Sequence, residues 1–580
     1  MGLETYWGVG PKTRETLEAS LGTEAAIDAI ERGDLAALVA GGVDRSRGTR
    51  ILRHAQPGAG MDLLATRDAR SVYKTIIDLA AERAVTQRAA DRIRTLTPLT
   101  DRDAIDDRLA AVERGRETWT GLDEATREAL VAAFAVDEEG GDPARVAAET
   151  VVAVQETGAT GPALDRVAAL DADALAAAGT ALGALDGDSV LAGADDELDR
   201  LRETRAAIDT MSASAATIVE DLQADGVRDA TAFRDGLVEH LRTETPVDAS
   251  RVRDAMAADA GDPTAFVTET LRELRRDLDG AIEDRTETVR EGFEADIAAA
   301  EDALDEAETA VAQAALELSL GRFADTYDLR QPTFVADGLA VENARNLALL
   351  DGGVDVQPIT YALGDHDLDA PNGDRVSVLT GANSGGKTTL LETLCQVAIL
   401  AHMGLPVPAD AAAVSLADRI VFHRRHASFN AGVLESTLQS VVPPLVSGER
   451  TVMLVDEFEA ITEPGRAADL LHGLVKLTVD QGALGTFVTH LADDLEPLPD
   501  AARTDGIVAD GLTDDLELRV DYQPRFGSVG RSTPEFIVSR LVANASDRAQ
   551  QAGFRTLAEA VGSEAVQRTL SDVEWQSAEE

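Results

Sequence analysis

The stretch VSVLTGANSGGKTTLL, from Val376 to Leu391, decides the fold of this chain. A β-branched apolar run meets a glycine-rich turn and then an apolar pattern with helical spacing, which predicts a strand, a loop and a helix. The spacing of Gly381, four residues and then Gly386-Lys387-Thr388 is typical of a phosphate-binding P-loop, where backbone N–H groups and a helix N-terminus surround the phosphates. The alternative is a glycine-rich turn that serves only tight packing, but such a turn would need neither Lys387 nor Thr388.

The P-loop residues predict a nucleotide site that also holds a metal ion. We expect Lys387 to reach the β- and γ-phosphates and the Thr388 hydroxyl to ligate Mg²⁺. The residues expected to contact the nucleotide are Gly381, Ala382, Asn383, Ser384, Gly385, Gly386, Lys387, Thr388 and Thr389.

Two further strand patterns supply candidate catalytic side chains. The segment TVMLVDE is a buried-strand pattern that ends in Asp456 and Glu457. We expect Asp456 to hold Mg²⁺ through water and Glu457 to orient or polarise the attacking water. The segment TFVTH predicts another strand, with His490 beside the γ-phosphate as a sensor. A histidine with a purely structural role is an equally open reading of that position.

These parts together predict an ATPase. In-line attack of water on a γ-phosphate needs charge neutralisation and positioning, which Lys387, Mg²⁺, Glu457 and the loop amides could provide. The predicted catalytic residues are therefore Glu457, Lys387 and His490. The sequence contains no Asn-Lys-x-Asp segment, which reads guanine in many GTPases, so ATP is favoured as the nucleotide.

The composition predicts a large, acidic and mostly helical chain. At 580 residues it is too long for one core, and 44% hydrophobic but only 4% aromatic residues favour helices over strands. The net charge is −52, and only four of the 53 basic residues are Lys. Such a surface suits concentrated salt, which screens the repulsion, so we expect a halophilic archaeal source. An acidic protein that avoids nucleic acid is the alternative.

Cysteine usage and hydropathy predict a cytoplasmic protein. The single cysteine, Cys395, excludes an internal disulfide and any multi-cysteine zinc site. No uncharged apolar segment of about 18 residues occurs, and the first twenty residues carry charges instead of an apolar signal core. We therefore expect no membrane partner.

The N-terminal residues predict a small DNA-binding module. The segment YWGVGPKT, from Tyr6 to Thr13, has a Gly-apolar-Gly turn before a short helix, and Val39 to Leu52 looks like a degenerate second copy. This arrangement resembles a helix-hairpin-helix module, in which the glycine turn contacts a DNA phosphate. Residues 1–94 carry a net charge of +1, which supports that placement. An ordinary helical hairpin is the alternative. The candidate DNA-binding residues are Gly8, Gly10, Lys12, Thr13, Arg45 and Arg47.

Four domains are expected in a fold that combines all-helical and α/β parts. Residues 1–56 would form the helix-hairpin-helix module, 57–330 a helical lever and coiled-coil clamp, 331–545 the P-loop ATPase domain and 546–580 a helical tail. Within the helical region, apolar residues recur at spacings of three and four in two arms, 196–242 and 265–320, which predicts an antiparallel coiled coil.

Several segments together resemble the MutS family of DNA-repair and recombination ATPases. That family's phosphate loop reads Gly-Pro-Asn-Met-Gly-Gly-Lys-Ser/Thr, and Asn383 and the double glycine here distinguish it from generic P-loops. Other matching segments are Phe429 with Leu434-Glu435-Ser436, Asp456-Glu457, Thr489-His490, Gly527 to Ser532, and Pro98 to Leu109. The resemblance implies an ATPase domain of ABC/MutS type, a homodimer with two composite ATP sites, and paired long helices that embrace double-stranded or branched DNA.

Two departures from the family pattern narrow the expected function. Where family members have Gly-Arg-Gly-Thr-Ser after the Asp-Glu pair, this chain has Phe458 to Gly465, so coupling between the two ATP sites is in question. No Phe precedes Phe134, so a mismatch-reading Phe wedge is not expected. Branched or recombining DNA is the expected substrate, with other repair proteins as candidate partners. The alternatives are a mismatch-binding repair protein and a chromosome-structuring or ABC-type ATPase, although no Leu-Ser-Gly-Gly signature occurs.

Overall fold

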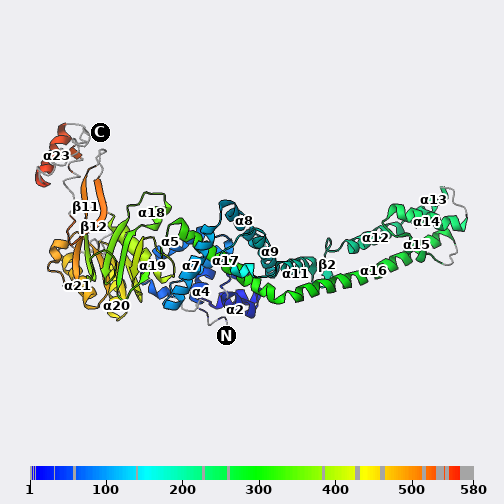
Figure 1. The fold of residues 1–580 in the computed structure, drawn as a ribbon, viewed down its shortest axis with the longest axis horizontal. Coiled ribbons are helices and arrows are strands. Elements are labelled where there is room, and N and C mark those ends of the chain that lie inside the picture. Colours follow the sequence, from blue (N-terminus) through cyan, green and yellow to red (C-terminus); the bar gives the residue numbers. More distant parts are fainter. Residues whose placement is uncertain are drawn as a thin grey trace. The chain divides into compact units, whose positions relative to one another are not determined.

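The chain folds into two compact units, each described here by itself. The computed structural model describes residues 3, 6, 8–31, 33–55, 60–138, 142–224, 229–257, 262–381, 386–424, 431–457, 464–512, 518–530, 538, 541–542 and 548–561 (Figure 1). Unit 1 comprises Met1–Arg127, Thr160–Leu164 and Ala312–Glu580, and unit 2 comprises Glu128–Ala159 and Asp165–Val311. The four expected domains are a finer division and stay a prediction.

A six-stranded sheet in unit 1 carries the P-loop. Its strand order is β12-β11-β6-β10-β9-β8, and all neighbours are parallel except β12, which pairs antiparallel with β11. The central strands are buried throughout, as their continuous apolar runs predict for a parallel sheet covered on both faces. The bounds are β6 Val376–Gly381, β8 Arg419–His423, β9 Thr451–Val455, β10 Leu484–Val488, β11 Ala502–Leu512 and β12 Leu518–Phe526.

A second sheet of four short strands lies in the same unit. Its order is β3-β7-β4-β5, with β3 and β7 parallel and the other pairs antiparallel. The bounds are β3 Thr333–Phe334, β4 Gly338–Ala344, β5 Ile359–Gly364 and β7 Ala411–Val414. The two sheets share one apolar core, to which both β4 and β6 contribute. The expected combination of helical and α/β parts is thus confirmed, whereas the expected domain bounds stay a prediction.

Helices complete the α/β part of unit 1. The helix that follows the P-loop, α19, is almost entirely buried and packs against both sheets (Figure 1). The bounds are α18 Leu347–Asp351, α19 Lys387–His402, α20 Ala431–Val446, α21 Pro464–Asp480, η5 Ala492–Leu495 and α23 Arg548–Val561. The expected polar tail, 546–580, is described only over α23.

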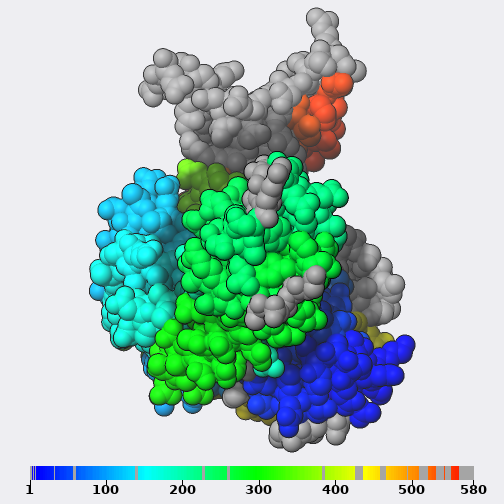
Figure 2. Space-filling view, turned by 90° about the vertical axis from the view of Figure 1, so that its right-hand side faces the viewer, coloured from blue at the N-terminus to red at the C-terminus, as the bar shows by residue number. Residues whose placement is uncertain are grey.

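The N-terminal part of unit 1 begins with a four-helix bundle around its own apolar core. This N-terminal bundle consists of α1 Pro11–Ser20, α2 Thr23–Glu31, α3 Leu35–Ala40 and α4 Arg45–Ala55, and it forms the dark blue surface of Figure 2. The helices that follow are η2 Met61–Leu63, α5 Arg67–Glu82, α6 Gln87–Thr95 and α7 Arg102–Gly121. Asp101 caps α7 by accepting a hydrogen bond from the backbone N–H of Ala104, 2.9 Å away.

Two helices of unit 1 cross with their backbones in direct contact. The helix α17, Glu301–Thr326, meets α7 where Gly115 and Gly321 face each other. A Cβ at residue 115 would lie 1.8 Å from the carbonyl oxygen of Glu317, and one at residue 321 would lie 2.3 Å from the backbone nitrogen of Arg116. Glycine at both positions is what permits this close crossing.

Unit 2 is helical apart from one short hairpin. Its helices are α8 Glu124–Phe134, which continues from unit 1, η3 Ala135–Glu138, α9 Pro143–Glu156, α10 Asp165–Ala168, α11 Ala172–Ala184, α12 Asp196–Ser212, α13 Ala215–Ala224, α14 Ala230–Glu244, α15 Ala249–Asp254 and α16 Pro263–Ala299. The hairpin consists of β1 Leu185–Asp186 and β2 Ser189–Val190. No helix among the residues that the structure describes is both long and apolar enough to cross a membrane.

The expected antiparallel pair of long arms is only partly correct. The second arm is the nearly continuous run of α16 and α17, but the first arm, 196–242, is three separate helices. Only α12 runs antiparallel beside α16, joined by Arg205 to Asp279 at 3.0 Å and Asp195 to Arg285 at 2.6 Å (Figure 1). The helices α13 to α15 pack with α12 and the first half of α16 around one apolar core. Burial of apolar side chains from several helices favours this core over a seam of two helices.

Cys395 provides a probe of folding. Its side chain is fully buried in α19, and burial raises the pKa of its thiol well above the usual range. We therefore expect iodoacetamide to label the native chain at negligible rate at pH 8 in multimolar KCl. If the acidic surface requires salt, labelling should become fast on dialysis into low salt, as measured by mass spectrometry. Unchanged protection in low salt would contradict the salt requirement.

Candidate nucleotide-binding site

The candidate site lies at the carboxyl edge of the six-stranded sheet. The ends of β6, β9 and β10 are joined there, because Thr489 donates its backbone N–H to the carbonyl of Leu379 and Glu457 donates to that of Val488, each at 3.0 Å. Ligands of open parallel sheets bind at this edge. The structure thus brings the P-loop strand and the two acidic residues of the sequence prediction to one place.

Glycine is required at both ends of the P-loop. Gly381 has φ +135° and Gly386 has φ +71°, values that other residues rarely adopt. A Cβ on Gly381 would lie 2.4 Å from the carbonyl oxygen of Ile507 on β11. Gly386 is the N-cap of α19 and has no side-chain cap, so the N–H groups of the first turn point toward the loop. Residues Ala382, Asn383, Ser384 and Gly385 lie outside the described residues.

Lys387 occupies the position expected of the P-loop lysine. Its Nζ donates a hydrogen bond to the carbonyl oxygen of Gly381 at 2.9 Å, and the residue is only 4% exposed. The ammonium group is therefore buried beside the end of β6. A phosphate there would meet a charged donor whose hydration has already been removed.

Thr388 and Asp456 lie within direct contact and fit a Mg²⁺ site. The Thr388 hydroxyl donates to Oδ2 of Asp456 at 2.6 Å, although the two residues are 68 positions apart. Asp456 is 2% exposed, and its backbone N–H bonds the carbonyl of His423 on β8. Oxygen ligands from one hydroxyl and one carboxylate suit Mg²⁺, which completes its coordination with water and phosphate. Both residues could hold this metal.

Glu457 and His490 form a pair beside that site. Nε2 of His490 lies 3.2 Å from Oε1 of Glu457, and the Glu457 side chain is nearly buried. Glu457 has φ +40°, an unfavourable backbone conformation for a glutamate, and such strain often accompanies functional positions. The histidine therefore orients a carboxylate. Both the sensor role and a purely structural role of His490 are compatible with this contact.

The structure adds an aromatic residue that sequence patterns missed. The ring of Tyr522 on β12 lies against Gly386, so that a Cβ on the glycine would come 2.8 Å from Cδ1 of the ring. Tyr522 is 42% exposed, which is unusual for so large an aromatic side chain. No local pattern indicates this contact, since 136 residues separate the two positions.

Thr389, the last residue of the predicted nucleotide site, lies in α19, where its carbonyl accepts a hydrogen bond from the Thr393 hydroxyl.

The candidate DNA-binding residues of the N-terminal bundle divide into two groups. Nη2 of Arg47 lies 3.5 Å from the carbonyl oxygen of Gly8, and Gly10 caps α1 with its backbone alone. Lys12 is exposed on the first turn of α1, so these four residues gather at one helix end.

The remaining two candidates have other surroundings. Thr13 is only 5% exposed, so its hydroxyl faces the bundle core. Arg45 makes two hydrogen bonds to the carboxylate of Asp91 on α6, at 2.7 and 3.0 Å. Both residues thus contribute to the structure of the bundle, which was not foreseen. Phe429 and the divergent segment 458–463 lie outside the described residues.

The larger sheet of unit 1 is an α/β arrangement of the kind that binds ligands at the carboxyl edge of its parallel strands. The family model described as MutS domain V matches residues 377–441, which run from the P-loop strand through most of α20. Over this segment the chain resembles proteins of the MutS family. Proteins of this family are in general ATPases that use ATP with Mg²⁺, bind DNA and typically form dimers.

Individual relatives agree with the family assignment. The chain is 43% identical over 219 residues to "DNA-binding protein MutS2" of Pyrococcus furiosus, a match that covers 37% of this chain and 38% of the relative. It is 30% identical over 274 residues to "DNA mismatch repair protein MutS" of Natronomonas pharaonis, covering 44% and 30%. It is 31% identical over 180 residues to "Endonuclease MutS2" of Thermus thermophilus, covering 30% and 23%. The chain thus spans well under half the length of these relatives.

Proposed function

We propose that this chain is an ATP-dependent DNA-binding protein of the MutS superfamily. It acts in the cytoplasm in DNA repair or recombination, as a homodimeric clamp on branched or otherwise structured double-stranded DNA, with other repair proteins as partners. The observation that carries the proposal is the carboxyl edge of the sheet, where Lys387 is buried beside the end of β6 and Thr388 bonds Asp456. The relatives named as DNA-binding and mismatch-repair proteins support the same activity.

In this proposal each residue at the edge has one task in ATP hydrolysis. Lys387 turns from the carbonyl of Gly381 to the β- and γ-phosphates, and the N–H groups at the start of α19 bind phosphate oxygens. Thr388 and Asp456 hold Mg²⁺, which neutralises charge on the phosphates. Glu457 orients the attacking water, and His490 keeps that carboxylate in place.

Charge distribution supports DNA contact at the N-terminal bundle instead of along unit 2. The sequence of unit 2 holds 44 acidic against 15 basic residues, a net charge of −29. Phosphate contact relies on positive side chains, so a surface of this charge repels DNA. The helix α4, by contrast, has four Arg and no acidic residue. The embrace of DNA by long paired helices, which the family resemblance implies, would therefore need contacts that overcome this repulsion.

A substitution at Arg47 tests this location. Arg47→Ala should weaken binding to junction, mismatched and plain duplex DNA by the same factor, roughly 3–10-fold, because a phosphate contact carries no sequence information. It should also lower the slope of log affinity against log salt by about one unit. Gel shifts over a range of KCl concentrations measure both quantities. The matched control is Arg200→Ala on unit 2, an exposed arginine paired with Glu197 at 2.9 Å.

The same titrations decide between the proposal and its rivals. Binding to no DNA at any salt concentration would refute the DNA claim. Selective binding to mismatched duplex would favour a mismatch-binding repair protein. ATP turnover that no DNA alters would favour a chromosome-structuring or ABC-type ATPase that acts on another partner. Equal loss of binding in the Arg47 and Arg200 variants would contradict the assignment to the N-terminal bundle.

A further inference from the structure

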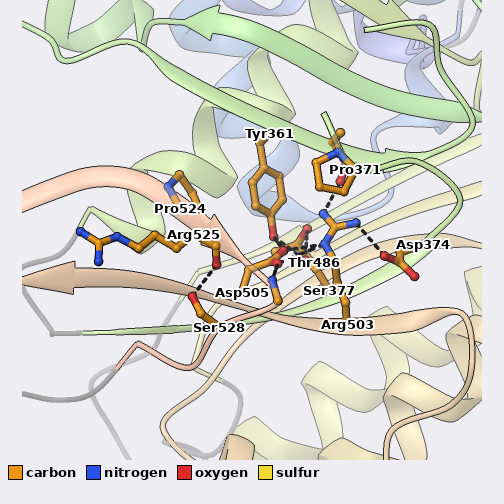
Figure 3. Close-up of polar contacts among 12 residues, drawn as sticks. Tyr361, Pro371, Asp374, Ser377, Thr486, Arg503, Asp505, Pro524, Arg525 and Ser528 are labelled. Atoms are coloured by element: carbon orange, nitrogen blue, oxygen red, sulfur yellow. Dashed lines mark hydrogen bonds and ion pairs between the residues drawn. The ribbon is translucent and has the colours of Figure 1, made fainter. Parts of the chain in front are cut away.

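A buried polar cluster lies behind the P-loop, among β5, β6, β10 and β11. Figure 3 shows Tyr361, Ser377, Arg503 and Asp505 converging. The Tyr361 hydroxyl donates to Oδ2 of Asp505 at 2.8 Å and lies 2.6 Å from Oγ of Ser377. Nε of Arg503 contacts both carboxylate oxygens of Asp505, at 3.0 and 3.1 Å. The Asp505 side chain is fully buried, so these contacts replace its water.

Stability alone does not account for this cluster. Desolvation raises the pKa of Asp505, although the Arg503 guanidinium opposes that shift, and desolvation raises the pKa of Tyr361 as well. Burying such a charged pair costs free energy that the mutual attraction only partly offsets, and apolar residues of similar volume often stabilise a core equally well. The benefit of a buried charged pair can instead lie in fixing one arrangement of the groups around it.

Asp505 and Thr380 together accept hydrogen bonds from both ends of the segment 527–530. Oδ1 of Asp505 accepts the backbone N–H of Gly527 at 3.1 Å. Its backbone carbonyl accepts the Thr380 hydroxyl at 3.0 Å, and the same hydroxyl accepts the N–H of Gly530 at 2.6 Å. Thr380 directly precedes Gly381, whose carbonyl oxygen binds Lys387. One hydroxyl therefore connects the start of the P-loop with the end of the segment 527–530.

The packing at this connection leaves no free space. A Cβ on Gly530 would lie 2.8 Å from the carbonyl oxygen of Thr380 and 2.9 Å from Cα of Gly381, and a Cβ on Gly506 would lie 2.2 Å from the nitrogen of Gly530. Backbone thus touches backbone at the first residue of the loop. Because close-packed interiors transmit small displacements, a shift of Gly381 moves Gly530 as well.

We propose that Thr380 and Asp505 are positioning residues that couple the start of the P-loop at Gly381 to the segment 527–530. This inference rests on the proposed nucleotide-binding function. When a phosphate attracts Lys387, the carbonyl of Gly381 loses a charged donor and the start of the loop relaxes. The Thr380 hydroxyl passes this movement to Gly530. Nucleotide occupancy thereby changes the position of Gly530.

The test removes the connecting hydroxyl and keeps the side-chain shape. Thr380→Val should leave the Kd for ATP within about twofold of the parent value, because the phosphate contacts stay. The kcat for ATP hydrolysis should fall roughly tenfold with little change in KM, since loop geometry matters most in the transition state. Limited trypsin digestion reports the coupling directly. In the parent chain an ATP analogue should change the cleavage rate at the arginines after residue 530, and in Thr380→Val it should not.

Two further variants separate positioning from simple structural damage. Thr380→Ser keeps the hydroxyl and should restore both kcat and the nucleotide-dependent cleavage. Thr478→Val removes another buried hydroxyl, which bonds the carbonyl of Leu474 one turn earlier in α21, and should change neither. If Thr380→Val does not fold, Tyr361→Phe removes one bond to Asp505 and should weaken the nucleotide-dependent change in cleavage at parental Kd.

The outcomes distinguish this inference from the proposed function. A parent chain that binds no ATP refutes the proposed function. A parent chain that binds ATP, together with a Thr380→Val variant that keeps the parent's kcat and cleavage response, refutes the coupling. A Thr380→Val variant that folds but no longer binds ATP also overturns it, because Thr380 would then belong to the binding site itself.

Discussion

Replacing Lys387 with alanine is expected to lower ATP turnover by about 10²–10³-fold, the loss typical of removing one charged donor from developing negative charge. The ammonium group is buried and lies 2.9 Å from the carbonyl of Gly381, so it is already stripped of water. Its removal leaves the phosphates with the backbone N–H groups of α19 and with Mg²⁺. Phosphate release at saturating ATP, in multimolar KCl, measures the effect.

The matched control uses another of the four lysines of this chain. Lys476 lies on the exposed face of α21, paired with Asp480 at 2.9 Å, and an exposed pair of this kind contributes little. Lys476→Ala should therefore keep the parental rate. Equal turnover in Lys387→Ala and in the parent would show that hydrolysis takes place at a different site.

Replacing Gly115 with alanine should destabilise unit 1 by about 3 kcal/mol or more. The added Cβ would lie 1.8 Å from the carbonyl oxygen of Glu317, a backbone atom that cannot turn away as a flexible side chain can. The helices α7 and α17 must then separate, which opens the apolar contacts on either side of the crossing. Urea titration in constant salt, followed by circular dichroism, measures the change in the free energy of unfolding.

Gly121 supplies the control in the same helix. A Cβ at Gly121 would meet nothing within 4 Å, so alanine there should be neutral or slightly stabilising, by about 0.5–1 kcal/mol. A Gly115→Ala variant as stable as Gly121→Ala would contradict the close crossing.

Local patterns predicted the fold around the P-loop well. Strand β6 and the start of α19 follow from nearest-neighbour chemistry, because β-branched residues favour the strand and Gly381 and Gly386 supply the positive φ angles at its end and at the helix start. The expected proximity of Thr388 to Asp456 also holds, since parallel strands bring their carboxyl ends to one edge.

Contacts between distant segments could not be predicted in this way. The local sequence predicts only ordinary strand residues at Tyr361, Arg503 and Asp505. The order of the strands in the sheet brings these residues together. Thr13 and Arg45 follow the pattern of phosphate-binding residues, yet one faces a core and the other finds Asp91, 46 positions away. No spacing rule indicates a partner so remote.

The prediction of two paired arms, 196–242 and 265–320, was only partly correct for a different reason. Apolar residues at spacings of three and four predict the helical segments correctly, but they do not state which helix each segment faces. The Ser212-Ala213-Ser214 segment ends α12, and the helices beyond it turn toward each other. A longer seam would have left Leu237 and Leu241 partly in water, whereas the local core buries both.

The Arg45–Asp91 contact has a further consequence for recognition. Asp91 is almost fully buried and also accepts hydrogen bonds from Arg94 and Gln87, while Arg53 on α4 bonds the carbonyl of Arg94 at 2.9 Å. The Asp91 carboxylate is buried while the Arg45 side chain is half exposed, so concentrated electrolyte screens this pair less than a pair of two exposed side chains. The bundle is therefore preorganised: orientational entropy is lost once, during folding, and not again each time a polyanion docks.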